Sequence, residues 1–108
     1  MKKNYLLFFI FSLIFSPSLL SAANRYVSVN GEGDGLSWAS PKGSIQAAVW
    51  DCAAGDTVFV SSGTYNEMFA ITDGVSVMGG YHPTTGERDI DAYVTTLDGQ
   101  GLGKYLIV

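Results

Sequence analysis

Cysteine, histidine and basic residues are scarce in this chain of 108 residues, and each shortage excludes a class of protein. Cys52 is the only cysteine, so no disulfide can form within the chain. His82 is the only histidine and has no cysteine near it in the sequence, which argues against a zinc site. Six basic residues against ten acidic ones give a net charge of −4, whereas a nucleic-acid partner would need a basic surface.

No apolar run in the chain reaches the ~20 residues that span a bilayer. The chain begins instead with two lysines, a compact apolar run up to Phe15, a break at Pro17 and the small residues SAA at 21–23. This layout predicts a cleaved secretory signal peptide over residues 1–23, with an uncleaved membrane anchor as the alternative. We therefore expect a secreted or cell-surface protein without a stable membrane span after cleavage, and a periplasmic location stays open.

Cleavage would make the remaining chain more acidic. It removes two lysines and leaves four basic residues against ten acidic ones, a net charge near −6. Such a surface argues against nucleic acid and against anionic lipid as partners. It fits a soluble exported protein, or carboxylates that bind a divalent cation.

The first part of the mature chain, residues 24–55, predicts a strand, a loop and a helix. The strand is expected over 24–30 and a glycine-rich loop over 30–35 (NGEGDG). The helix is expected over 44–54, because Ser44 can cap it and Gly55 can end it. Its apolar residues recur at the spacing of one buried face: Ile45, Ala48, Val49 and Cys52.

The second part, residues 56–108, reads as a series of short strands. We expect strands at 57–60, 68–71, 75–78, 94–97 and 105–108, separated by the turn signals SG at 62–63, DG at 73–74, GG at 79–80 and DG at 98–99. Strand spacing alone allows a sandwich or a small barrel. The recurring Val-x-Val followed by glycine favours an all-β solenoid, in which each turn covers the apolar edge of the preceding one.

The length and the last residues indicate an incomplete domain. A chain this short buries a modest core, and it has no disulfides to compensate. Residues 105–108 (YLIV) would end the chain on an unpaired apolar strand, an arrangement that natural proteins avoid. We expect a truncated solenoid whose exposed edge needs downstream coils or self-association to cover it.

Several motifs occur in an order typical of one superfamily. They are YVSVNG at 26–31, GDGLSW at 33–38, IQAA at 45–48, AGDTVFV at 54–60, GTY at 63–65, VSVMGGY at 75–81, ERD at 87–89 and TLDG at 96–99. The chain resembles the N-terminal cap and first coils of bacterial secreted right-handed parallel β-helix proteins, the pectin-lyase-like superfamily.

This resemblance implies a right-handed parallel β-helix with an N-terminal capping α-helix. Residues 24–55 would form the cap, whose helix plugs the open end, and residues 56–108 the first, incomplete coils. The superfamily includes polysaccharide lyases and hydrolases, adhesins and large surface proteins. Its enzymes carry catalytic carboxylates, calcium ligands and basic residues on later coils, so the resemblance assigns no site residue here.

Most candidate site residues have a simpler structural interpretation. The loop at 30–35 has too few carboxylates for a strong calcium site, so a surface loop is favoured. Asp56, Asp73 and Asp98 each adjoin glycine and are expected to form turns rather than a catalytic pair. Cys52, on the apolar face of the helix, is expected to be a packed and inert thiol.

Two further groups leave alternatives open. Arg88 lies between acids in residues 87–91 (ERDID), and local ion pairs are favoured over a clamp for substrate. Aromatic side chains could stack against sugars or pack within the cap, and packing is favoured; they are Trp38, Trp50, Tyr65 and Tyr81.

The prediction for function is an exported, non-catalytic β-helix surface protein with a structural or adhesive role. We expect no active site, cofactor or metal in this chain, and a polysaccharide or cell-surface glycan as the partner. One alternative is the N-terminal fragment of a polysaccharide lyase or hydrolase whose active site lies beyond Val108. The other is a carbohydrate-binding module.

Overall fold

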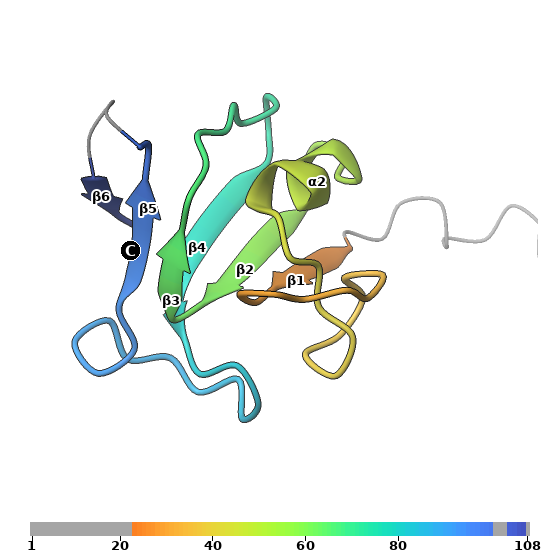
Figure 1. Ribbon diagram of the computed structural model, residues 1–108. Coiled ribbons are helices and arrows are strands. Elements are labelled where there is room, and N and C mark those ends of the chain that lie inside the picture. Colours follow the sequence, from red (N-terminus) through yellow and green to blue (C-terminus); the bar gives the residue numbers. More distant parts are fainter. Residues whose placement is uncertain (1–22, 101–103, 108) are drawn as a thin grey trace, which may run out of the picture.

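The computed structural model describes residues 23–100 and 104–107, and most of their regular structure is strand with one short helix (Figure 1). The predicted signal peptide at 1–23 lies outside the described residues, except for Ala23. The described strands form two open sheets and no closed barrel.

The first sheet is entirely parallel. It contains β1 (Asn24–Val27), β2 (Thr57–Ser61) and β4 (Ser76–Tyr81) in the order β1-β2-β4. Its strands lie side by side beneath the helix in Figure 1. Each connection between paired strands is long enough for the crossover that parallel pairing requires.

The second sheet is mixed. It contains β3 (Gly63–Tyr65), β5 (Thr95–Asp98) and β6 (Lys104–Leu106) in the order β3-β5-β6. Strand β3 pairs with β5 in parallel, whereas β5 and β6 are antiparallel. The antiparallel pair differs from the uniformly parallel coils that we expected. The connection from β5 to β6 is too short for a parallel crossover, so the chain folds back instead.

Helix α2 (Ile45–Trp50) is shorter than the sequence predicted. Ser44 caps its start as expected, with extended backbone angles and a hydroxyl that accepts a hydrogen bond from the Ala47 N–H at 3.3 Å. The prediction that it continues to residue 54 is wrong. The N–H groups of Asp51 and Cys52 donate to carbonyls only three residues earlier, which tightens and ends the last turn.

A glutamate from a distant loop completes the start of α2. The Glu67 carboxylate accepts hydrogen bonds from the Ile45 N–H at 2.9 Å and the Gln46 N–H at 3.2 Å. It also accepts one from the Ser44 hydroxyl at 3.2 Å. N–H groups at a helix start have no partner within the helix, so Glu67 satisfies two of them and anchors α2 to the segment after β3.

Replacing Glu67 is therefore expected to loosen the helix. Glu67→Ala should lower the free energy of unfolding by about 1–2 kcal/mol, because two half-buried N–H groups lose a charged acceptor. Urea unfolding followed by circular dichroism measures this loss. Glu67→Gln is the matched control, since it keeps one acceptor oxygen and should lose less. An alanine variant as stable as the wild type would contradict this role.

The predicted strand at 68–71 is absent. Met68 and Ile71 are exposed, and this segment lies along α2 rather than beside a strand. The Gln46 side chain pairs with the backbone of Ala70, accepting from its N–H at 2.9 Å and donating to its carbonyl at 3.3 Å. A side-chain amide has thus replaced a neighbouring strand as the partner of this backbone.

The turn expected at Gly79 and Gly80 is also wrong, because both glycines are buried inside β4. A Cβ on Gly79 would collide with the Ile107 carbonyl and the Thr95 side chain. Gly79 therefore leaves room for the close approach of another segment, whereas Gly80, with a φ of +86°, lies where the register between β2 and β4 shifts.

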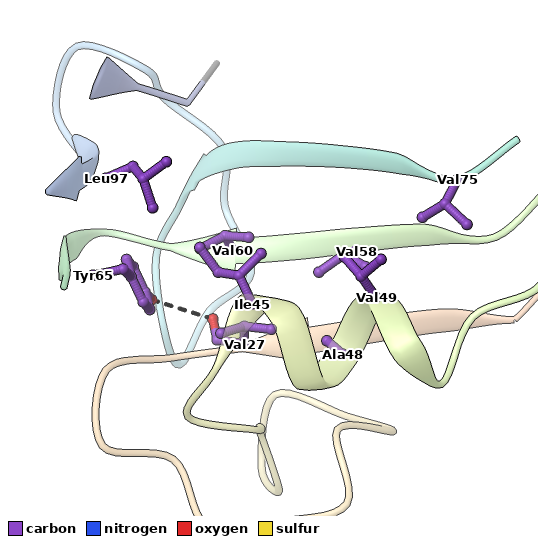
Figure 2. Packing of buried hydrophobic residues seen from close by; sticks show 9 residues of the cluster. All are labelled: Val27, Ile45, Ala48, Val49, Val58, Val60, Tyr65, Val75 and Leu97. Carbon is purple, nitrogen blue, oxygen red and sulfur yellow. Dashed lines mark hydrogen bonds between the residues drawn. The ribbon is translucent and has the colours of Figure 1, made fainter. Parts of the chain in front are cut away.

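The core lies between α2 and the inward face of the first sheet, and it extends to the second sheet (Figure 2). Its members are buried apolar side chains: Val27, Ile45, Ala48, Val49, Val58, Val60, Tyr65, Val75 and Leu97. The predicted apolar face of the helix is confirmed, with Cys52 partly buried at its edge. The alternation that places Val58 and Val60 on one face is confirmed as well.

Candidate functional site

An aromatic surface lies on the outward face of the first sheet. Successive side chains of a strand point to opposite faces, so the burial of Val27, Val58 and Val60 turns their neighbours outward. Tyr26 and Phe59 are such neighbours, and the strand register places them directly side by side. Their ring centroids are 5.5 Å apart.

Two more aromatic rings complete the group. The Trp38 ring lies 5.0 Å from Tyr26 and 5.8 Å from Tyr81, measured between centroids. The Tyr81 ring lies 5.1 Å from Phe59 in an edge-to-face arrangement. We call these four half-buried rings, Tyr26, Trp38, Phe59 and Tyr81, the aromatic platform. Each ring contacts two others at distances typical of favourable aromatic pairs.

Backbone hydrogen bonds hold the loop that carries Trp38 against β1. The Tyr26 N–H donates to the Gly35 carbonyl at 2.8 Å, and the Lys42 N–H donates to the Tyr26 carbonyl at 2.9 Å. On its other side Trp38 lies against Gly86, which has a φ of +72° and no room for a Cβ beside the indole. The indole is thus held between a strand and a glycine turn.

The platform surrounds a shallow depression of about 290 Å³, lined by Asn24, Tyr26, Trp38, Phe59, Tyr81 and Gly86. The Arg88 guanidinium lies 5.6 Å from the centre of the Tyr81 ring, and its Nε donates to the Gly79 carbonyl at 3.1 Å. Aromatic faces next to an amide and a guanidinium offer an apolar surface with hydrogen-bond donors at its rim.

The four aromatic residues proposed from the sequence divide between three environments. Trp38 and Tyr81 belong to the platform, whereas Tyr65 is 3% exposed in the core and cannot stack with a ligand. Trp50 is 75% exposed but belongs to α2, which packs on the opposite face of the sheet. Sequence reasoning missed Tyr26 and Phe59, although their alternation with buried valines could have placed both on the outward face.

The predicted ion pairs of Arg88 are absent from the described part of the chain. Glu87 instead accepts a hydrogen bond from the Tyr93 hydroxyl at 2.8 Å, which raises the pKa of Tyr93. Asp89 accepts from the N–H groups of the two residues Asp91 and Ala92 and so closes a turn. The acids in this loop shape its backbone and leave the guanidinium beside the platform.

His82 stabilises a turn. Its Nδ1 accepts from the N–H groups of Thr84 and Thr85, each at 3.2 Å, and its ring packs edge-to-face on Tyr93 at 5.1 Å. Among the described residues no group of three or more histidine, cysteine or acidic side chains is close enough to hold a metal ion.

A larger hollow of about 700 Å³ lies beside the glycine-rich loop, but few of the side chains that line it could bind a ligand. Glycine backbone makes up much of its wall, and Glu32 is the one carboxylate that lines it. The Asp34 carboxylate is turned to its own loop, where it accepts from the Leu36 N–H at 3.0 Å. Calcium takes six to eight oxygen ligands, so this arrangement fits the surface loop that was favoured.

The remaining candidate residues are structural where the structure describes their contacts. Asp98 accepts from the Gln100 N–H at 2.9 Å in a turn, as expected. The Cys52 thiol donates to the Ala48 carbonyl at 3.3 Å, and burial raises its pKa, so the reactive thiolate is disfavoured.

Comparison of the chain with protein-family models, with curated proteins and with solved structures returns no match. None of the described residues belongs to a helix long and apolar enough to cross a membrane. The geometry of the chain is therefore the basis for a functional proposal. The aromatic platform, with its four mutually contacting rings, is the most distinctive surface among the described residues.

Proposed function

We propose that this chain is the N-terminal part of an exported β-helix surface protein, and that it adheres to carbohydrate through the aromatic platform. The observation that carries the proposal is the set of four mutually contacting rings on the outward face of the parallel sheet. The C–H groups on one face of a pyranose ring pack well against aromatic rings, and hydrogen-bond donors at the rim reach its hydroxyls.

The pairing of the strands supports a parallel β-helix, and its right-handed turn is what the family resemblance implies. Strands β2 and β3 follow each other in the chain, as do β4 and β5, and β4 pairs with β2 while β5 pairs with β3. Such an arrangement stacks one two-strand unit on the next, as in a solenoid. Helix α2 buries one face against β1 and β2, where a cap would cover the end of the core.

A neutral polysaccharide is the ligand class that suits the charge of the chain. The exported chain would carry a net charge near −6, which disfavours polyanionic glycans. Arg88 is the basic side chain stacked at the platform, and it is flanked in the sequence by Glu87 and Asp89. Adhesion at a cell surface would require neither a catalytic carboxylate nor a metal.

Replacing Trp38 should weaken carbohydrate binding. Affinity electrophoresis of the exported protein in gels containing a neutral β-glucan, a xylan or polygalacturonate measures binding. We expect retardation by a neutral polysaccharide and a loss of affinity of roughly tenfold or more in Trp38→Ala, because a central aromatic contact is removed. Trp50→Ala is the matched control and should bind like the wild type, since it lies on the other face.

Two results would contradict the proposal. One is the absence of retardation by every glycan, and the other is equal binding by the two tryptophan variants. Incubation with pectic and other acidic glycans, with and without calcium, tests the enzymatic alternative. Formation of unsaturated sugar ends would replace the adhesive role with that of a lyase.

A further inference from the structure

The Asp56 carboxylate connects the start of the described chain to the turn after α2. Its Oδ1 accepts a hydrogen bond from the Ala23 N–H at 2.8 Å, and its Oδ2 accepts one from the Ala53 N–H at 2.9 Å. The backbone of Asp56 is bonded as well, because its N–H donates to the Ala53 carbonyl and its carbonyl accepts from the Ser76 N–H. The residue is 6% exposed, so the carboxylate is held in one place.

This buried carboxylate has no ion-pair partner in the described ranges. Arg25, whose charge acts on it, donates its guanidinium to the carbonyls of Asn24 and Asp51 instead, each at 3.2 Å. The Asp51 carboxylate pairs with Lys42 at 3.1 Å. Hydrogen bonds from the Ala53 and Ala23 N–H groups lower the pKa of Asp56, so it is ionised near neutral pH. The two N–H groups therefore stabilise the charged form, and a counter-ion at the same place would stabilise it further.

We infer that export processing cleaves the chain between Ala22 and Ala23, and that the new α-ammonium group of Ala23 binds the Asp56 carboxylate. Signal peptidase would hydrolyse this peptide bond with water, leaving a carboxylate on Ala22 and an ammonium group on Ala23. The nitrogen already lies 2.8 Å from Oδ1, a distance typical of a charge-assisted hydrogen bond. Cleavage would therefore place a counter-ion within hydrogen-bond distance of the carboxylate.

The small residues SAA at 21–23 allow cleavage after either alanine, and the structure distinguishes the two positions. Cleavage after Ala23, where the signal peptide predicted from the sequence ends, would leave Asn24 as the first residue and remove the group that is bonded to Asp56. Cleavage after Ala22 keeps that group and adds a charge to it. The resulting pair would hold β1 at the sheet edge against β2 in the processed chain alone.

The first test identifies the terminal residue. The full 108-residue chain is exported from bacterial cells and the processed product is weighed by intact mass spectrometry. We expect a product that begins at Ala23. A product that begins at Asn24 or at any other residue would overturn the inference while leaving export intact. Because the inference rests on the proposed export, an uncleaved chain would count against that export itself.

The second test detects the ion pair by its pH dependence. An α-ammonium group has an ordinary pKa of about 8, so its contribution is complete below that pH and is lost as the pH rises. Between pH 7 and pH 10 we expect the thermal midpoint of the processed product to fall by roughly 4–8 °C more than that of Asp56→Asn. Equal falls in the two proteins would overturn the inference.

Other charged groups near Asp56 require a control. Arg25, Asp51 and Cys52 interact with this region, and the Cys52 thiol loses its proton at alkaline pH. Both proteins are therefore compared in a Cys52→Ala background. Selective acetylation of the α-amine removes the terminal charge but keeps one N–H, so it should lower the midpoint at pH 7 even if Asp56→Asn does not fold. An unchanged midpoint after acetylation would overturn the inference.

Discussion

Ile45→Ala is expected to lower the free energy of unfolding by about 2–5 kcal/mol, the range for a fully buried isoleucine reduced to alanine. Ile45 is 0% exposed and starts α2, and its side chain points into the cluster formed with the first sheet (Figure 2). A protein of this size has a total stability of roughly 5–15 kcal/mol, so the variant should unfold at a much lower urea concentration.

The control for this prediction lies on the same helix. Trp50→Ala removes a larger side chain that is 75% exposed, and it should change stability by less than about 0.5 kcal/mol. Far-ultraviolet circular dichroism in urea measures both variants independently of tryptophan fluorescence. A loss below about 1 kcal/mol for Ile45→Ala would mean that α2 does not pack on the sheet in solution.

Alkaline pH is expected to destabilise the protein through Tyr65, with a loss of about 2–3 kcal/mol by pH 12. The Tyr65 hydroxyl donates to the Ser61 carbonyl at 3.0 Å and lies 3.1 Å from the Ser61 hydroxyl. Figure 2 shows the Tyr65 hydroxyl directed at Val27 and draws its hydrogen bond to the Val27 carbonyl. Burial raises the pKa of Tyr65 to about 12, two units above its ordinary value.

The direction of the effect follows from proton binding. Below about pH 10 the phenol is protonated in both the folded and the unfolded chain, and the contribution of Tyr65 is complete. Between about pH 10 and 12 the unfolded chain releases the proton while the folded chain keeps it, so stability falls as the pH rises.

Tyr65→Phe separates this effect from the titration of other groups. It should cost about 0.5–1.5 kcal/mol at pH 7, because the buried Ser61 carbonyl loses its phenolic donor but keeps the Thr95 hydroxyl. It should then lose less stability than the wild type between pH 9 and 11, as measured by urea unfolding at each pH. Parallel pH dependences in the two proteins would show that Tyr65 ionises freely in the folded state.

The helix and the inward face of the sheet were predictable because they depend on local patterns. Ser44 caps α2 as expected, and the helical spacing of Ile45 and Val49 placed both in the core. The alternation of Val58 and Val60 predicted the buried face of β2. In each case the deciding neighbours lie within a few residues, so the sequence contains the whole signal.

The errors arose where a distant segment provides a backbone partner. The apolar run around Met68 looked like a strand, but the Gln46 side chain binds its backbone and leaves Met68 exposed. Gly79 and Gly80 looked like a turn, yet both are buried in β4, where Ile107 passes close to Gly79 and Ile90 close to Gly80. Local composition does not contain this information.

The sequence by itself determined most of the short β-strands, the capped start of the helix and the acidic charge of the chain. Only the tertiary structure decided that Tyr26, Trp38, Phe59 and Tyr81 share one surface, and that Ala23 meets Asp56 across 33 residues. The reason is physical: strand register and loop packing bring these side chains together, and both depend on contacts between residues far apart in the chain. Periodicity assigns a residue to a face, whereas the register of the neighbouring strands selects its partner on that face.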